Sequence, residues 1–300
     1  MSHPIEVENL SKHFGKTVAV DDLSFTVREG QVTAFLGSNG AGKTTTIQTI
    51  LNLHRPNSGS ASLFGIDSRK SGPREFRQIG YVSENMELPL WMTVEQYLKY
   101  CRPFYPTWDD EFSAQLMEEF QLPHDRKLRN LSRGMRMKAA LVGGIAYRPK
   151  LVILDEPFSG LDPLVRDEFI RGLLRMTGEQ GWTVFLSSHD IEEVERLADR
   201  VILIDSGRKR VDETTAGILE SCRRVEVYCG EEIEENFSAP EDWHGFRSAG
   251  RSASFGISES IEDLEAEIRS QLPEVNRIES HEMSLREVFV MMAAQFRIES

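Results

Sequence analysis

Cysteine is scarce in this sequence, and the few cysteines form no recognisable pattern. Only Cys101, Cys222 and Cys229 occur among 300 residues. Their spacing matches neither a zinc site nor a disulfide framework. We therefore expect free thiols and a reducing compartment.

The sequence also lacks a long apolar run. The longest wholly apolar segment, Ala139–Tyr147, is too short to cross a bilayer as a helix. The opening residues, MSHPIEVENLSKHFG, carry charges where a secretory signal would need an apolar stretch. We expect neither a signal nor a membrane span, so a partner would have to bring this chain to a membrane.

A surplus of positive charge is absent as well. The formal net charge is −13, and most of it lies in residues 214–300, which carry 8 Lys and Arg against 18 Asp and Glu. Residues 1–213 carry 27 against 30. General affinity for nucleic acid needs a basic surface, so we expect no nucleic-acid partner. The net charge and the pattern of expected strands and helices both change near residue 214, which predicts a domain boundary there.

What the sequence does contain is an alternation of strand and helix patterns, which indicates a mostly parallel sheet. Residues from about 86 to 148 are mainly helical in pattern. Residues 214–300 predict a small α+β domain. Strands are expected at 5–10, 17–27, 31–37, 61–65, 79–84, 151–155, 183–188, 223–230 and 252–258, and helices at 43–53, 164–178, 191–198, 261–272 and 284–296.

The segment GSNGAGKT at 37–44 matches a phosphate-binding loop between a strand and a helix. Its glycines let backbone N–H groups surround a triphosphate, and Lys43 adds a point charge. The Thr44 hydroxyl suits Mg²⁺. We assign to nucleotide binding Gly37, Ser38, Asn39, Gly40, Ala41, Gly42, Lys43, Thr44 and Thr45.

The catalytic candidates follow two apolar strands. LVILDEP ends in Asp155 and Glu156, and successive strand residues point to opposite sides, so these carboxylates serve different purposes. Asp155 suits Mg²⁺ and Glu156 suits activation of the attacking water. His189, in SSHD, stands where ligands bind in open α/β sheets and can contact the γ-phosphate.

A second anion site is indicated at residues 130–138, NLSRGMRMK, which have the pattern of a helix start. Ser132 offers a capping hydroxyl, and Gly134 permits close approach to the backbone. The N-terminus of a helix attracts anions. The sequence therefore contains two phosphate-binding candidates about ninety residues apart.

GSNGAGKT, LSRGM, LVILDEP, SGLD and SSHD, in this order over residues 5–213, resemble the nucleotide-binding subunit of ATP-binding-cassette (ABC) transporters. The resemblance implies a P-loop NTPase fold of the ABC type, with a mixed sheet core and a helical subdomain at about 86–148. It also implies ATP and Mg²⁺ as ligands and ATP hydrolysis as the reaction. Residues 214–300 resemble an accessory extension.

The resemblance also assigns the second phosphate site. In that family two domains stack head to tail, so Ser132 and Gly134 of LSRGM would contact the ATP bound to a partner subunit. Arg133 and Met135 replace the usual glycine and glutamine, a form that occurs in the ABC-2 branch.

Two further positions follow from the resemblance. Glu84 stands where the family has a glutamine near Mg²⁺, and its carboxylate adds a negative charge there. Phe14 matches the aromatic residue that stacks on adenine.

The leading functional expectation is an ATPase that powers a separate membrane permease, as an ABC-2-type exporter, from the inner face of the plasma membrane. A homodimer is expected, and the helical insert would receive the permease through Leu88, Leu90, Trp91 and Tyr97. The alternative is a soluble ABC-type ATPase in assembly, gating or regulation. A nucleotide-dependent binding module is a third reading, which Glu156 disfavours.

Overall fold

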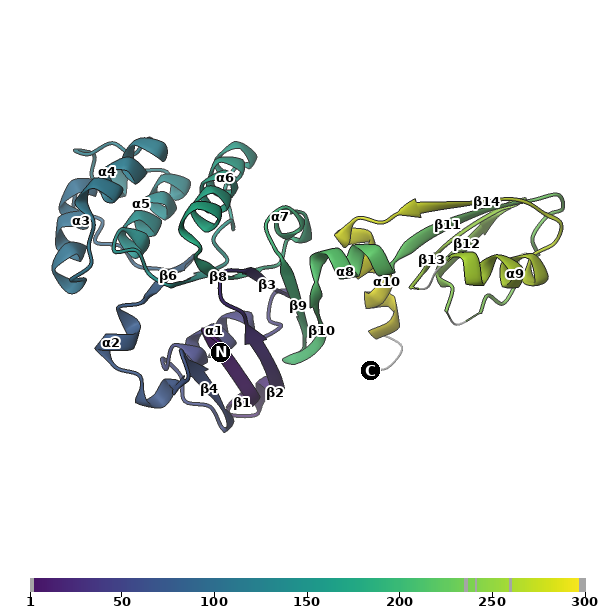
Figure 1. Cartoon of the computed structure of the whole chain (residues 1–300), viewed down its shortest axis with the longest axis horizontal. Helices are drawn as coiled ribbons and strands as arrows, with labels where there is room; N and C mark the ends of the chain where they lie inside the picture. Colours follow the sequence, from purple (N-terminus) through teal and green to yellow (C-terminus); the bar gives the residue numbers. More distant parts are fainter. Residues whose placement is uncertain (1–2, 235–236, 241, 259–260, 297–300) are drawn as a thin grey trace. The chain divides into compact units, whose positions relative to one another are not determined.

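The computed structural model describes residues 3–234, 237–240, 242–258 and 261–296. The chain divides into two compact units, residues 1–212 and 213–300. The first unit contains two sheets and most of the helices (Figure 1).

A six-stranded sheet forms the framework of the first unit. Its order is β10-β9-β3-β8-β7-β6, and β9, β3, β8, β7 and β6 run parallel. The carboxyl ends of these parallel strands therefore meet at one edge. The strands are β3 Val32–Leu36, β6 Ile79–Ser83, β7 Leu151–Asp155, β8 Thr183–Ser188, β9 Arg200–Asp205 and β10 Arg208–Thr214.

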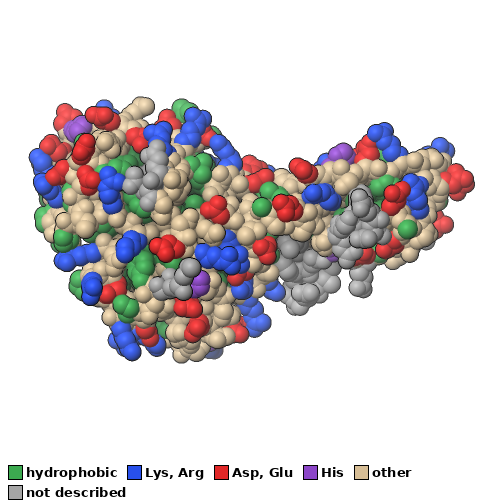
Figure 2. Space-filling view, in the orientation of Figure 1, with side chains coloured by type: hydrophobic (Ala, Val, Ile, Leu, Met, Phe, Trp, Pro, Cys, Tyr) green, Lys and Arg blue, Asp and Glu red, His purple; other side chains and the backbone are tan. Residues whose placement is uncertain are grey.

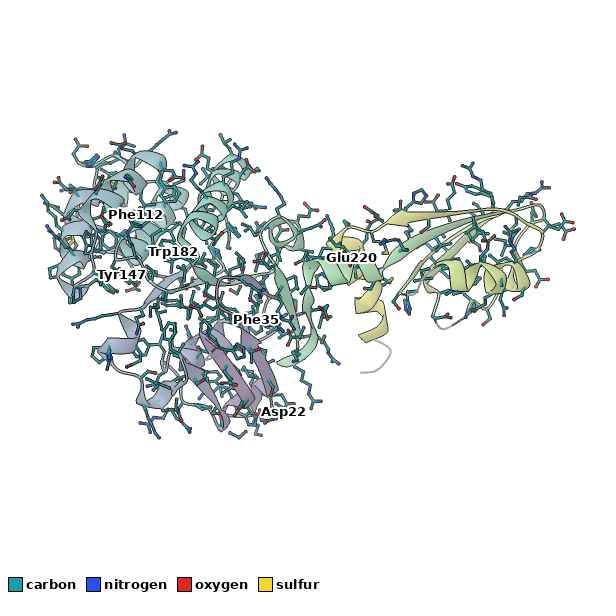
Figure 3. The ribbon with its side chains drawn as sticks, viewed as in Figure 1. Asp22, Phe35, Phe112, Tyr147, Trp182 and Glu220 are labelled. Carbon is teal, nitrogen blue, oxygen red and sulfur yellow. The ribbon has the colours of Figure 1, made fainter. Side chains whose placement is uncertain are left out.

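A second, antiparallel sheet packs against the first. Its order is β2-β1-β4-β5, and helix α1 contacts strands of both sheets. Phe25 of this sheet stacks on Phe185 and lies beside Phe35, so aromatic rings fill the space between the layers. Figure 3 labels Phe35 within the first unit. The strands are β1 Ile5–Phe14, β2 Thr17–Val27, β4 Ser58–Leu63 and β5 Ile66–Asp67.

Several helices begin at a residue whose side chain caps them. The Thr93 hydroxyl accepts from the Gln96 N–H, and the Gln96 side chain accepts from the Thr93 N–H, which starts α3. The Asp162 carboxylate, followed by Pro163, caps α6 by accepting from the Val165 N–H at 3.1 Å. The helices of the first unit are α1 Lys43–Ile50, α2 Pro73–Phe76, α3 Val94–Cys101, α4 Asp110–Glu119, α5 Arg133–Ile145, α6 Pro163–Gln180 and α7 Ile191–Glu195.

The second unit is an antiparallel sheet with helices. The sheet order is β12-β13-β11-β14, and α9 contributes Leu264 and Ile268 to the core beneath it. Trp243 stacks on Phe255 within that core. The elements are α8 Thr215–Ser221, β11 Arg223–Cys229, β12 His244–Ala249, β13 Ser252–Ile257, α9 Ile261–Gln271, β14 Val275–Glu282 and α10 Leu285–Phe296.

The architecture confirms the expected α/β fold class, with two differences in detail. The N-terminal strands belong to their own antiparallel sheet and not to the parallel one. The elements that were not expected from the sequence are the strands β5, β9, β10, β12 and β14 and the helices α2 and α8. None of the helices among the described residues has the length and apolar character needed to span a membrane. On the face drawn in Figure 2, acidic and basic side chains of the first unit are interspersed.

Truncation of Phe185 tests the aromatic core. Phe185→Ala should lower the free energy of unfolding of the first unit by about 3–5 kcal/mol, because a fully buried ring between two sheets leaves a cavity. Urea denaturation measures the effect. Leu164→Ala, at an exposed position, serves as the control and should change stability by less than about 0.5 kcal/mol. Equal losses in the two variants would contradict the assignment of Phe185 to the core.

Candidate active site

Four candidate residues follow directly after neighbouring parallel strands. Gly37 comes after β3, Glu84 after β6, Glu156 after β7 and His189 after β8. The register aligns these ends, with Leu36 beside Ser188 and Ser83 beside Asp155. The sheet thus gathers at one edge residues that span about 150 positions of sequence.

The loop at 37–44 needs its glycines for steric reasons. Gly40 and Gly42 have positive φ angles of 84° and 105°. A Cβ on Gly42 would lie 2.3 Å from the Ala19 carbonyl oxygen, and one on Gly37 would lie 2.6 Å from that of Ile204. Larger residues are excluded here, so the backbone N–H groups stay accessible to a phosphate.

Lys43 is the buried cation of the site. Its side chain is 5% exposed, and Nζ donates to the carbonyl oxygens of Gly37 at 2.6 Å and Ser38 at 3.1 Å. The Glu156 carboxylate pairs with the same ammonium at 3.0 Å. Three oxygens therefore compensate the buried charge, and a triphosphate would have to compete with them.

Glu156 links Lys43 to His189. Its Oε2 lies 2.8 Å from His189 Nδ1, and its backbone N–H donates to Ser187 Oγ at 2.9 Å. The backbone of Glu156 has a φ of 53°, so this residue leaves the strand path instead of continuing it. The expectation that Asp155 and Glu156 differ in role was argued from strand alternation, whereas the structure separates them by this left-handed turn.

Asp155 is almost fully buried at the end of β7. Its Oδ1 accepts hydrogen bonds from Ser187 Oγ at 2.7 Å and Thr44 Oγ1 at 3.1 Å. Burial raises the pKa of this carboxyl, and the two hydroxyl donors oppose the shift. Ser187 thus binds the Asp155 carboxylate and the Glu156 backbone N–H, a role that sequence reasoning missed.

The oxygens around Asp155 fit a magnesium ion, which prefers hard oxygen ligands. The Thr44 hydroxyl and the Asp155 carboxylate already lie in contact. The Glu84 backbone N–H donates to the Asp155 carbonyl oxygen at 2.9 Å, which places a third oxygen-bearing residue beside them. Thr44 and Asp155 supply oxygen donors of the kind that Mg²⁺ takes, and the assignment of Thr44, Glu84 and Asp155 to the metal stays a prediction.

The Glu84 carboxylate has partners of its own. Arg133 Nη2 pairs with Glu84 Oε1, and Ser159 Oγ donates to the same oxygen at 2.9 Å. Two of the three departures from the usual family motifs, at 84 and 133, thus contact each other. Sequence alone provides no signal for this pair.

The segment LSRGM begins helix α5, as expected. Ser132 caps the helix by accepting from the Met135 N–H at 3.2 Å. A Cβ on Gly134 would lie 2.7 Å from Val165 Cγ1, so close packing on α6 requires the glycine. The close approach expected at Gly134 therefore occurs within the chain, and its contact with a phosphate remains a prediction.

Phe14 lies at the end of β1 with 45% of its side chain exposed. Its ring packs edge-on against His54 at 5.3 Å, and Lys12 Nζ lies 4.8 Å from the ring centre. An exposed ring suits stacking on a base.

The helical insert differs from the expectation at one residue. Tyr97 is buried with its ring against Gly143, so it belongs to the core and was wrongly offered as a partner contact. Leu90 and Trp91 are exposed, and exposed Tyr100 and Phe104 accompany them. Leu88 and Leu90 also line a cavity of about 640 Å³ beside Glu84 and Arg133.

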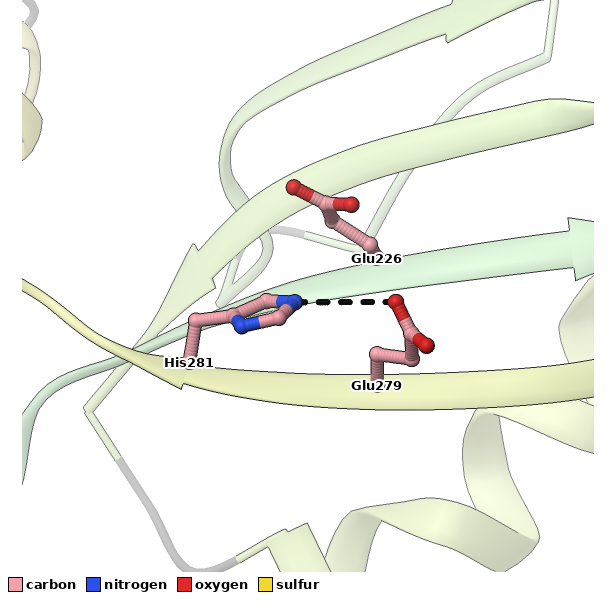
Figure 4. A group of neighbouring side chains, drawn as sticks. All are labelled: Glu226, Glu279 and His281. Carbon is pink, nitrogen blue, oxygen red and sulfur yellow. Dashed lines mark ion pairs between the residues drawn. The ribbon is translucent and has the colours of Figure 1, made fainter.

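A cluster of three ionisable side chains lies in the second unit. Glu226, Glu279 and His281 occupy adjacent strands, and their nearest ligand atoms lie within 4.8 Å of one another (Figure 4). Arg277 pairs with Glu279, and Arg224 lies 3.6 Å from Glu226. The two carboxylates are thus already compensated, which explains the group as an ion-pair network.

Glu193 is a buried carboxyl next to His189 that the sequence did not single out. Burial raises its pKa from 4.5 to about 7, although the Arg166 guanidinium at 2.8 Å lowers it. Ser188 Oγ donates to Glu193 at 3.1 Å, and Asp190 lies nearby. The sequence IEEVERLA does not indicate that Glu193 is buried, because it contains three glutamates that are typical of an exposed helix.

The site is that of a P-loop NTPase, and comparisons define the family. Residues 20–159 match the family model of ABC transporters. A Nod factor export ATP-binding protein of Burkholderia lata is 35% identical over 243 residues, covering 75% of this chain and 76% of that protein.

Further similarities agree. A sulfate/thiosulfate import ATP-binding protein of Yersinia pestis is 34% identical over 212 residues, covering 68% of this chain and 58% of that one. A solved ATP-binding subunit of an ABC transporter has 30% identity and a TM-score of 0.64, covering 72% of this chain and 92% of that one. The chain belongs to the ABC transporter ATP-binding proteins. It binds ATP, is an ATPase, and serves a membrane transporter.

Glu193 predicts a pH dependence of stability. Between about pH 4.5 and 7 the folded chain retains a proton that the unfolded chain releases, so the contribution of Glu193 to stability falls as pH rises through this window. The free energy of unfolding of Glu193→Gln should therefore rise by about 1–3 kcal/mol relative to that of the wild type as the pH is raised from 5 to 8. Urea unfolding at each pH measures the difference.

Glu192→Gln, at an exposed position of the same helix, should follow the wild-type pH profile. Parallel profiles for wild type and Glu193→Gln would show that Glu193 has an ordinary pKa.

Proposed function

We propose that this chain is the ATP-hydrolysing subunit of an ABC-2-type exporter and that it works as a dimer on the inner face of the membrane, held there by a permease. The observation that carries the proposal is the contact of Lys43, Glu156 and His189 at one sheet edge. The similarity to a Nod factor export protein and the K/R-G-M form of LSRGM favour export.

Nucleotide binding would proceed by exchange at Lys43. The β- and γ-phosphate oxygens replace the Glu156 carboxylate at the ammonium, and the N–H groups of the loop 37–45 surround the phosphates. Phe14 stacks on the adenine. Thr44, Asp155 and Glu84 would hold Mg²⁺, which supplies charge neutralisation to the phosphates when bound.

Release from Lys43 makes the Glu156 carboxylate available to a water molecule. Glu156 then accepts a proton from the attacking water, while His189, 2.8 Å away, orients the carboxylate and faces the γ-phosphate. The left-handed backbone of Glu156 takes this residue off the path of the strand that ends at Asp155. The two acids thereby keep separate tasks.

The dimer would complete each site from the partner. Ser132 and the Gly134 N–H at the start of α5 would contact the γ-phosphate held by the other chain, with the helix dipole behind them. ATP would close the dimer and hydrolysis would reopen it. Leu90 and Trp91, exposed on the helical insert, would transmit this movement to the permease.

Glu156→Gln tests the assignment of the base. The variant should retain ATP binding, because the triphosphate no longer competes with a carboxylate for Lys43, while turnover falls about 10²–10⁴-fold. Equilibrium binding and steady-state phosphate release measure the two effects. Near-normal turnover would remove Glu156 from this role, and the exposed Glu192→Gln provides the matched control.

Mixing of two defective chains tests the composite sites. Lys43→Ala should weaken ATP binding, and Ser132→Ala should leave binding intact but lower turnover. In a mixed dimer one site receives both intact residues, so up to about a quarter of wild-type activity should return. No recovery despite formation of mixed dimers, shown by pull-down of tagged chains, would contradict sharing across the interface.

A further inference from the structure

Two charged residues that are distant in sequence join three segments of the site. Glu84 follows β6, and Arg133 is the first residue of α5. Their side chains form an ion pair, and Ser159 Oγ donates to the same Glu84 oxygen at 2.9 Å. The loop after β6, the start of α5 and the segment SGLD therefore share one contact point.

The surroundings fix both side chains. The Glu84 backbone N–H donates to the Asp155 carbonyl oxygen, which holds this residue beside the proposed metal site. A Cβ on Gly160 would lie 2.7 Å from Arg133 Nη1, so the guanidinium passes over a position where only glycine leaves room. The Glu84 side chain is 26% exposed and that of Arg133 is 45% exposed.

Each carboxylate of the site has its own compensating partner. Lys43 pairs with Glu156, and hydroxyl groups donate to Asp155. Arg133 is the cation that pairs with Glu84. A divalent cation approaching Asp155 would attract the same Glu84 carboxylate, so the cation and the guanidinium would compete for one group.

We propose that Arg133 is a positioning residue that holds Glu84 and competes with the divalent cation for its carboxylate. The inference rests on the proposed function, in which Glu84 helps to hold Mg²⁺. When the cation takes Glu84, Arg133 is released at the N-terminus of α5, the surface assigned to the partner's nucleotide. Binding of the cation in one chain would thereby change the position of the Arg133 charge at the surface that faces the nucleotide of the partner chain.

The test measures how strongly Mg²⁺ enhances nucleotide affinity. The Kd of the β,γ-imido analogue of ATP is determined by fluorescence competition in EDTA and in Mg²⁺. The Kd in EDTA divided by the Kd in Mg²⁺ gives the enhancement of affinity by the metal, and this ratio is compared among the variants. In Arg133→Gln this ratio should rise about 2- to 5-fold, the range for loss of a partly exposed ion-pair competitor. Arg133→Lys, which keeps the charge, should restore most of the wild-type ratio.

Two controls make the effect specific. Arg136→Gln removes a charge one turn further along α5, in the same cavity lining, and should leave the ratio unchanged. Arg133→Gln combined with Glu84→Gln should give the ratio of Glu84→Gln alone. An equal effect of Arg133→Gln in both backgrounds, or an equal effect of Arg136→Gln, would overturn the proposal.

A second readout needs no metal or nucleotide. In EDTA, the urea midpoints of wild type, the two single variants and the double variant form a double-mutant cycle. The double variant should lose little more than either single variant, and additive losses would overturn the pairing. The proposed function fails separately, if Lys43→Ala binds the analogue as tightly as wild type.

Discussion

The buried ammonium of Lys43 constrains the whole nucleotide site. An unpaired charge at 5% exposure would cost several kcal/mol, and it is compensated by the carbonyl oxygens of Gly37 and Ser38 and by Glu156. These oxygens come from the loop after β3 and from the end of β7. The loop, helix α1 and strand β7 must therefore lie together for the cation to be stable.

The parallel sheet meets this requirement by aligning strand ends. Residues 37, 84, 156 and 189 each follow a strand of the same sheet, and the register keeps those ends level. Glu156 departs from the strand with a left-handed backbone, a conformation that costs about 1–3 kcal/mol for a residue other than glycine. The hydrogen bond from its N–H to Ser187 and the pairing of its carboxylate offset that strain.

The sequence predicted those parts of the fold that depend on an apolar run or on a residue with a particular conformation or capping group. The loop glycines, the apolar strands β7 and β8 and the Ser132 cap are of this kind. Strands β12 and β14 were missed because their exposed and half-buried residues follow no apolar alternation. Tyr97 was misjudged because helical periodicity does not reveal that Gly143, on another helix, makes room for its ring.

The candidate residues were identified as a set, but their contacts were not. Glu84 and Arg133 are 49 positions apart and belong to different patterns, so only the tertiary fold could bring them together. Ser187 and Ser159 belong to the quoted segments SSHD and SGLD, but those segments do not indicate which groups the two hydroxyls contact.

The site contains two ion pairs, Lys43 with Glu156 and Arg133 with Glu84. In the proposed function a magnesium nucleotide would exchange both, because the triphosphate would replace the carboxylate at Lys43 and the metal would replace the guanidinium at Glu84. In the proposed cycle, Lys43 loses a carboxylate and gains a phosphate, and Glu84 loses a guanidinium and gains a metal cation, so neither of these two charges is left uncompensated. The groups released are the base Glu156 and the cation Arg133 at the start of α5. Binding would thus prepare hydrolysis in one site and change the surface offered to the partner in a single electrostatic exchange.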